Sequence, residues 1–421
     1  MSARVTFILL GALIALLGVV AIAKGDDALP PPPALTEKAL ADWLAHGSPR
    51  AAAIATAGDI AAADVVTARR LPNPTVGYSD DSTVSGTDTI GGNVHSVSLG
   101  VELPIFGQRH ARIDAALARQ AATGADVEAQ RLELAREGRR AFVELLAAQE
   151  KTAVREELVH ETERVAKIVE GRAAAGKKSQ YDVERIRLEL ANDQRLLGQA
   201  RADQEEAAGR LAALAGLPDW HPRAEGRLAP HGVDTDAARL WAHAEKTLPA
   251  LKAGALGHAA DVADIEVARR EGYPVPELTV GEQTTTDPHG VAVSAGITVP
   301  LPVFDRNQGE IARKGAEANA SALTLEASRR EARAELQSAV AVLLRRRETL
   351  ASFDRDASDR VPRLKEMADA FYRSGEGSIV DLLDALNAIG EARLGRIELL
   401  GELVPAELDV EFAAGLDVTP S

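Results

Sequence analysis

Several motifs occur twice in this chain of 421 residues, in the same order and about 199 residues apart. Leu-Pro-Ile-Phe at 103–106 is matched by Leu-Pro-Val-Phe at 301–304, and Gly-x-x-Ser-x-x-Asp at 176–182 is matched at 375–381. Repetition at a fixed period indicates an architecture built from duplicated units. The sequence therefore predicts two copies of one unit, each a β-hairpin, a long helix, a turn and a returning helix.

Each copy begins with two runs in which apolar residues alternate with small or polar ones. The predicted strands span 75–83, 97–103, 277–286 and 291–301. A half-buried hairpin in a soluble domain would give the same period of two. Strands of this length with one apolar face also fit a transmembrane barrel. Since an open edge in lipid leaves backbone groups unpaired, four strands could serve there only if several chains shared one barrel.

Long helices account for most of the remainder. Residues 108–172 contain no proline and are rich in Ala, Leu, Glu and Arg, and one helix of this span would be roughly 100 Å long. Similar segments cover 308–353 and 378–401. The fold class is thus mainly α with a small β part. Antiparallel coiled-coil pairing is expected, and the residues chosen for the packing face are Leu158, Val165, Ile168 and Val169.

The N-terminus has the pattern of a secretory signal peptide. A basic start leads into the apolar run 5–23, which ends in Ala-Ile-Ala, as a cleavage site requires. A single membrane anchor is the alternative, because 19 apolar residues could just span a bilayer. The predicted organisation is a signal peptide (1–23), a tether and first helices (24–70), the first repeat (71–215), a linker and helix (216–270), and the second repeat (271–421).

Composition and spacing argue against several functions. The net charge of −15 and the absence of cysteine disfavour a nucleic-acid partner and exclude thiolate metal sites. Residues 171–179 nearly spell a phosphate-binding loop, but Lys178 separates the first lysine from Ser179 and the flanks are helical. The nine histidines have no metal-ligand spacing. No enzyme activity, cofactor or resident metal site is therefore predicted.

The mature chain resembles the TolC family of outer-membrane factors over essentially its whole length. The resemblance rests on RLPNP (70–74), LPIFGQR (103–109) and LPVFDRNQGEIA (301–312), together with the order of elements. The last motif is similar to the heavy-metal cation efflux branch of that family. An outer-membrane channel for drug efflux or type I secretion is the alternative within the family. A soluble periplasmic coiled-coil adaptor or structural protein is the alternative from another class.

The resemblance implies a homotrimer in the outer membrane of a Gram-negative bacterium. Each chain would give four strands to one shared barrel in outer-membrane lipid, and the helices would form a coiled-coil tunnel across the periplasm. A periplasmic membrane-fusion adaptor and an inner-membrane RND-type transporter would be the partners of this passive duct. Pro104, Phe106, Pro302 and Phe304 would mark the corners between barrel and tunnel, although turn formation with a packed aromatic explains them equally well.

The family's periplasmic tip, where the adaptor docks, falls on the repeated motif. The positions implied for adaptor contact are Gly176, Lys177, Lys178, Ser179, Gly375, Gly377 and Ser378. Glycine ending one helix, serine capping the next and aspartate in its first turn also describe any well-capped helical hairpin. Both interpretations remain open from sequence.

The second copy adds a feature that capping does not require. Asp381 and Asp384 share one helix face, which Glu391 and Glu398 continue, while the packed side carries Ile379, Leu382, Leu383, Leu386 and Ile389. The resemblance implies that these aspartates form a ring of six carboxylates at the constriction, which would attract cations and raise some of their pKa values by crowding. A solvated acidic stripe is the alternative.

The resemblance also implies a latch that holds the tip closed. Tyr372 and Asp182 match the family's latch positions. An arginine that some members place two residues after the tip glycine is absent, because Gly377 stands there, and Arg373 is the candidate replacement.

Overall fold

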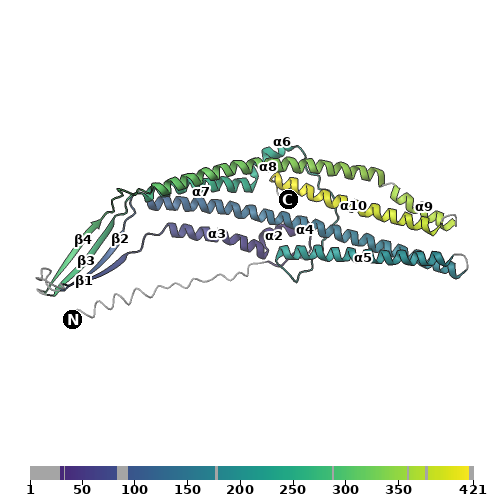
Figure 1. Cartoon of the computed structure of the whole chain (residues 1–421), viewed down its shortest axis with the longest axis horizontal. Coiled ribbons are helices and arrows are strands. Elements are labelled where there is room, and N and C mark those ends of the chain that lie inside the picture. The colour runs from purple at the N-terminus through teal and green to yellow at the C-terminus, as the bar shows by residue number, and fades with distance from the viewer. Residues whose placement is uncertain are drawn as a thin grey trace.

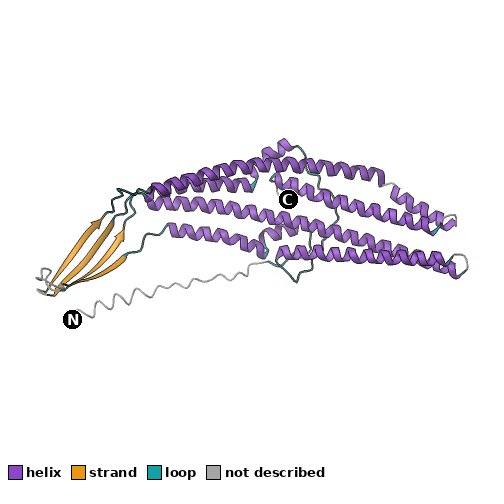
Figure 2. Cartoon of the chain, viewed as in Figure 1, coloured by secondary structure: helices purple, strands orange, loops and turns teal. Residues whose placement is uncertain are grey.

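The chain is elongated, with a small sheet at one end and helices extending to the other (Figures 1 and 2). The computed structural model describes residues 29–32, 34–82, 93–175, 179–286, 289–357, 360–374 and 378–416. The predicted signal peptide lies outside these residues.

The elements follow one another as two similar series. The first contains α2 (Glu37–His46), α3 (Pro49–Ala68), β1 (Thr75–Asp81), β2 (Val94–Glu102), α4 (Gln108–Ala174) and α5 (Gln180–Ala215). The second contains α6 (Ala237–Thr247), α7 (Pro249–Glu271), β3 (Glu277–Thr286), β4 (His289–Thr298), α8 (Gln308–Ala357), α9 (Arg360–Ser374) and α10 (Ile379–Ala413). The mainly helical fold with a small β part is therefore confirmed.

The four strands form one antiparallel sheet in the order β1-β2-β3-β4. Paired residues point to the same side of a sheet, so the register Val76↔Leu99↔Val280 and its neighbours collect the apolar side chains on one face. The opposite face carries small and polar residues, as in Gly77↔Ser98↔Gly281. Among the described residues, the outer edges of β1 and β4 have no strand partner. A one-sided sheet with two open edges is the arrangement expected of a segment of a larger barrel.

The corners between sheet and helices are built in the same way in both copies. Gly107 and Asn307 adopt positive φ angles of 87° and 63° immediately before α4 and α8. The side chain of the next residue then accepts a hydrogen bond from the backbone N–H two positions earlier. Gln108 Oε1 accepts from Phe106 at 2.9 Å, and Gln308 Oε1 accepts from Arg306 at 2.8 Å. The duplication thus extends to backbone conformation.

Helix α4 lies at the centre of the helical bundle and packs against α2, α3, α5, α7 and α10. Glycine permits two of these close approaches. A Cβ at Gly390 of α10 would lie 2.6 Å from Leu158 Cδ1, and one at Gly138 of α4 would collide with Leu44 of α2. Of the predicted packing face, Leu158, Val165 and Val169 are buried.

Two sequence predictions for the helices were wrong in detail. Ile168 is exposed, because it is one position away from Val169 and therefore turned by about 100° from the packing face. Helix α10 continues past Gly401 to Ala413 and includes Pro405. Proline removes one backbone hydrogen bond, and the burial of Leu403, Val404 and Leu408 around it offsets that loss.

The segment 37–68 is long and apolar enough to cross a membrane by composition. It forms two helices rather than one, since α2 ends at His46 and α3 begins at Pro49. Leu40 and Leu44 of α2 are fully buried in the main core, so this segment packs against the helical bundle.

Halfway along the helices, a buried carboxylate fixes the connector 216–236, which joins the two copies. Glu407 of α10 has no exposed side-chain surface. It accepts hydrogen bonds from the backbone N–H groups of His231 (2.5 Å) and Gly232 (3.3 Å) and from Arg347 Nη2 of α8 (2.6 Å). A buried charge is stable only with this kind of full compensation.

The imidazole of His231 extends this network to the other helices. Its Nε2 lies 3.3 Å from Glu37 of α2, and its Nδ1 lies 3.6 Å from Glu411 of α10. Arg139 of α4 bridges the same two carboxylates at 2.6 and 2.9 Å. Hydrogen bonding to Glu37 and Glu411 raises the pKa of His231 to about 10. With His231 protonated, the charges of the network therefore balance. Its acidic members are Glu37, Glu407 and Glu411, and its basic members are Arg139, His231 and Arg347.

Candidate gate at the helical tip

The end of the molecule farthest from the sheet is formed by α4, α5, α9 and α10 (Figure 1). These helices share an apolar core that is separate from the main one. Its buried members are Val165, Ala166, Val169, Val183, Ile186, Tyr372, Ile379, Leu382, Leu383 and Leu386. This tip core joins the α4–α5 pair of the first repeat to the α9–α10 pair of the second.

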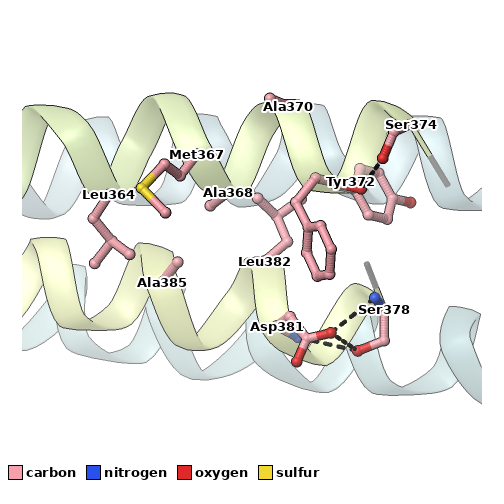
Figure 3. A pocket seen from close by; sticks show the side chains of 11 residues that line it. Leu364, Met367, Ala368, Ala370, Tyr372, Ser374, Ser378, Asp381, Leu382 and Ala385 are labelled. Carbon is pink, nitrogen blue, oxygen red and sulfur yellow. Dashed lines mark hydrogen bonds between the residues drawn. The ribbon is translucent and has the colours of Figure 1, made fainter. Parts of the chain in front are cut away.

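Both returning helices begin with the same reciprocal cap. In α5, Ser179 Oγ accepts the N–H of Asp182 at 3.2 Å and Asp182 Oδ2 accepts the N–H of Ser179 at 3.3 Å. In α10, Ser378 Oγ accepts the N–H of Asp381 at 3.2 Å, and Asp381 Oδ2 accepts the N–H of Ser378 at 2.9 Å (Figure 3). Each cap satisfies helix N–H groups that otherwise have no partner.

Capping also sets the protonation of one candidate gate residue. Hydrogen bonds from the hydroxyl and N–H of Ser378 lower the pKa of Asp381. Within one chain this effect is opposite to the rise expected from crowding around an axis. Within one chain, the lowered pKa therefore favours the charged form of Asp381.

The acidic stripe on α10 is exposed, as the helical spacing predicts. Asp381, Asp384, Glu391 and Glu398 are all exposed, whereas the five apolar residues assigned to the packed side are buried. Glu398 pairs with Lys151 at 3.0 Å. Among the described residues, no hydrogen bond or ion pair engages the carboxylates of Asp384 and Glu391. These two side chains are available to attract cations.

Tyr372 and Asp182 come together at the tip with a third residue that the sequence did not single out. Tyr372 is buried, and the Arg172 guanidinium carbon lies 4.9 Å from its ring centroid. Burial raises the pKa of Tyr372, the neighbouring Arg172 opposes this, and the negative charge of Asp182 adds to it. Arg172 of α4 is thus the cation that lies over the Tyr372 ring. The only signal in the sequence is a basic residue in the last turn before Gly176.

Part of the predicted tip cannot be placed. Gly176, Lys177, Lys178, Gly375 and Gly377 lie outside the described residues, as does the side chain of Arg373. Ser179 and Ser378 are described, and both serve as helix caps.

The aromatic residues at the two corners differ in their surroundings. Phe106 stacks on Tyr273 with ring centroids 6.1 Å apart, while Phe304 is 94% exposed. Pro104 and Pro302 both lie in the connections that follow a strand. Phe106, although 41% exposed, therefore has the aromatic contact that the turn interpretation expects, and among the described residues Phe304 has none. Among the described residues, no group of three His, Asp or Glu side chains could hold a metal ion.

A one-sided sheet with two open edges, continued by paired helices that converge on a capped tip, defines a subunit of a channel that several copies share. The comparison with protein families gives the particular assignment. The chain belongs to the outer membrane efflux protein family, whose model matches residues 44–217 and 241–416.

Similar proteins agree with this assignment. The cobalt-zinc-cadmium resistance protein CzcC of Cupriavidus metallidurans is 25% identical over 359 residues, which cover 83% of each chain. A membrane protein from Pseudomonas aeruginosa has the same fold, with a TM-score of 0.73 and 21% identity over 90% of both chains. The channel CusC aligns with a TM-score of 0.70 and 18% identity over 90% of this chain and 92% of its own.

Family membership decides between the broad alternatives. The chain is an outer-membrane efflux channel subunit with four strands in a shared barrel and a helical tunnel, and it is not an enzyme. The family consists of trimeric outer-membrane channels whose helical part lies in the periplasm and which work with adaptors and RND pumps. The soluble adaptor alternative is therefore excluded.

Proposed function

We propose that this chain forms the outer-membrane duct of a tripartite pump that exports heavy-metal cations. The observation that carries the proposal is the combination of likeness to a cobalt-zinc-cadmium resistance protein over most of the chain with the exposed Asp381 and Asp384 at the tip. The motif at 301–312 supports the same branch. Drug efflux and protein secretion are the competing outcomes.

In this proposal the transport step is passive and the tip controls it. The three chains of the trimer bring Asp381 and Asp384 around the threefold axis. There the carboxylates raise the local concentration of cations and repel anions. Export is driven by the RND-type transporter, which the duct reaches through a periplasmic adaptor. The adaptor contacts the two tips, around Ser179 and Ser378 and the residues that precede them.

Closure of the tip is assigned to contacts between the two copies of the repeat. Arg172, Asp182 and Tyr372 hold α4, α5 and α9 together, with Arg172 supplying the cation that Gly377 does not provide. A cation over an aromatic face contributes about 1 kcal/mol when partly desolvated. This is a strength that adaptor docking could overcome.

The opposite end of the molecule is assigned to the outer membrane. The apolar face of the sheet, which includes Val76, Leu99 and Val280, contacts lipid, and the small and polar face lines the pore. Residues 1–23 direct secretion and are removed.

The cargo is tested by deleting the coding sequence and challenging the strain with Co²⁺, Zn²⁺ and Cd²⁺ and, separately, with dyes, detergents and antibiotics. The proposal expects sensitivity to the metal ions alone, restored by the wild-type chain. A variant with both Asp381→Asn and Asp384→Asn, shown to assemble by its trimer band on a native gel, is expected to restore metal resistance only partly. Sensitivity confined to drugs and detergents would contradict the metal assignment.

A further inference from the structure

An open apolar groove lies between α9 and α10 at the tip. Its volume is about 660 Å³, and it is lined by Leu364, Met367 and Phe371 of α9 and by Leu382 and Ala385 of α10. Met367, Phe371 and Leu364 are 68%, 46% and 38% exposed. Large apolar side chains gathered on one surface indicate a contact with another molecule.

The groove lies against the outer side of the tip core. Tyr372 and Leu382 belong to that core and also line the groove, whereas Met367 and Phe371 line it from outside the core and are exposed. Figure 3 shows α4 and α5 behind the α9–α10 pair, with Leu364 and Met367 directed into the space between the two helices. The groove is therefore on the surface that the core leaves uncovered.

The acidic stripe and the groove share this surface. Asp381 and Ser378 line the end of the groove nearest the tip (Figure 3). Any assembly that turns Asp381 toward a common axis consequently turns the groove toward that axis as well.

We propose that the grooves of the three subunits of the trimer face one another, so that Met367 and Phe371 of each subunit are covered by the same residues of the neighbouring subunits. This assignment rests on the proposed function, because it takes Asp381 to line the aperture. The occupant of the groove is thus a second copy of this chain. The result is an apolar collar beside the carboxylate ring.

The collar and the ring have different physical effects. A narrow apolar constriction stays dry and blocks ions until it widens, whereas a carboxylate ring selects among the ions that pass. The collar therefore decides whether the tip conducts, and Asp381 and Asp384 decide which ions it conducts. Opening must separate the Phe371 side chains from one another.

Cross-linking tests the placement directly, because the chain has no cysteine and one introduced thiol can react only with its copies. The full-length trimer carrying Phe371→Cys is oxidised with diamide and resolved on a denaturing gel. A dimer band is expected, since two of three thiols can pair at the axis. The matched control is Glu366→Cys, on the same helix and exposed but outside the groove, which is expected to remain monomeric on the gel.

Other occupants of the groove give different patterns. Strong cross-linking only in the double variant Phe371→Cys/Tyr181→Cys would place α5 of the next copy in the groove and overturn the collar. A Phe371→Cys trimer that stays unlinked, and that is shielded from a maleimide reagent only when the adaptor is added, would assign the groove to the adaptor and also overturn it.

Single-channel recording tests the division of roles. Phe371→Ala/Met367→Ala is expected to raise the resting conductance severalfold with unchanged cation preference, while Phe371→Leu, which keeps an apolar side chain, stays close to wild type. Unchanged resting conductance in the alanine variant, with an intact trimer on a native gel, would overturn the collar. Unchanged selectivity in Asp381→Asn/Asp384→Asn would instead contradict the proposed carboxylate ring, and the cross-link would still report on the groove.

Discussion

The middle of the helical bundle and its tip use charge in opposite ways. In the middle, Glu407 is fully buried and every charge around it has a partner. At the tip, the core is apolar, and acidic side chains such as Asp384 lie exposed on the outside. The arrangement in the middle joins α2, α4, α8, α10 and the connector 216–236 into one unit. The arrangement at the tip leaves a charged surface that can act on ions.

The difference indicates which part of the molecule can move. Separating the helices at the middle would expose buried charges without their partners, at a cost of several kcal/mol each. Separating the two repeats at the tip would break apolar contacts, the Arg172–Tyr372 pair and partly exposed ion pairs such as Lys365–Glu161, which are individually weaker and reversible. Opening is therefore expected at the tip, about a fixed middle.

The largest expected effect follows from removing the central carboxylate. Glu407→Ala leaves Arg347 and the N–H groups of His231 and Gly232 without their acceptor, which should destabilise the fold by about 3–5 kcal/mol. Thermal unfolding of the detergent-solubilised trimer measures this change. Glu407→Gln keeps an acceptor and is expected to lose less. If the alanine variant unfolded at the same temperature as the wild type, the middle of the bundle would not be the fixed element.

A smaller, pH-dependent effect is expected at His231. Its pKa is raised from 6.5 to about 10 by Glu37 and Glu411, so the stabilisation is complete below pH 6.5 and is lost as the pH rises through about 10. Relative to wild type, His231→Gln should be less stable by about 2 kcal/mol at pH 6. This figure is smaller than the full pKa shift would give, because solvent screens part of the interaction.

The sign of this dependence is the useful part of the test. Unfolding of the wild type and of His231→Gln is compared from pH 6 to pH 10, with Arg139 retained in both. The gap between the two should narrow as the pH rises. A gap that widens toward pH 10 would mean that His231 is neutral in the folded protein.

The tip should respond more weakly to the loss of its cation. Arg172→Ala removes an interaction worth about 1 kcal/mol, so we expect the trimer to melt almost normally but to show a higher resting conductance. Arg172→Lys keeps the charge and should fall between the two. A large drop in melting temperature without a change in conductance would assign Arg172 to the fold rather than to the latch.

Local patterns allowed much of this architecture to be predicted. The alternation in 97–103 and the S-x-x-D caps at Ser179 and Ser378 depend on neighbours in sequence, and these features appear as strands and reciprocal caps. The exposed face of α10 follows from helical spacing in the same way.

Contacts between distant segments were not accessible from these patterns. Glu37 and Arg139 are about a hundred residues apart, and neither has a local signature that identifies its partner. Arg172 and Tyr372 meet only because the two copies pack at the tip, and the groove at Phe371 exists only between two helices. Ile168 shows the same limit within one helix, since a shift of one residue reverses burial.

The central claim, that the exposed acidic face of the tip selects the ions that pass, is tested most directly by reversal potentials in planar bilayers. The channel with Asp381→Asn/Asp384→Asn is compared with wild type and with Glu205→Gln, which removes an exposed carboxylate near the other end of α5, away from the tip. We expect the cation preference and the block by divalent ions to weaken in the first variant alone. The same reversal potential in all three channels would contradict the claim.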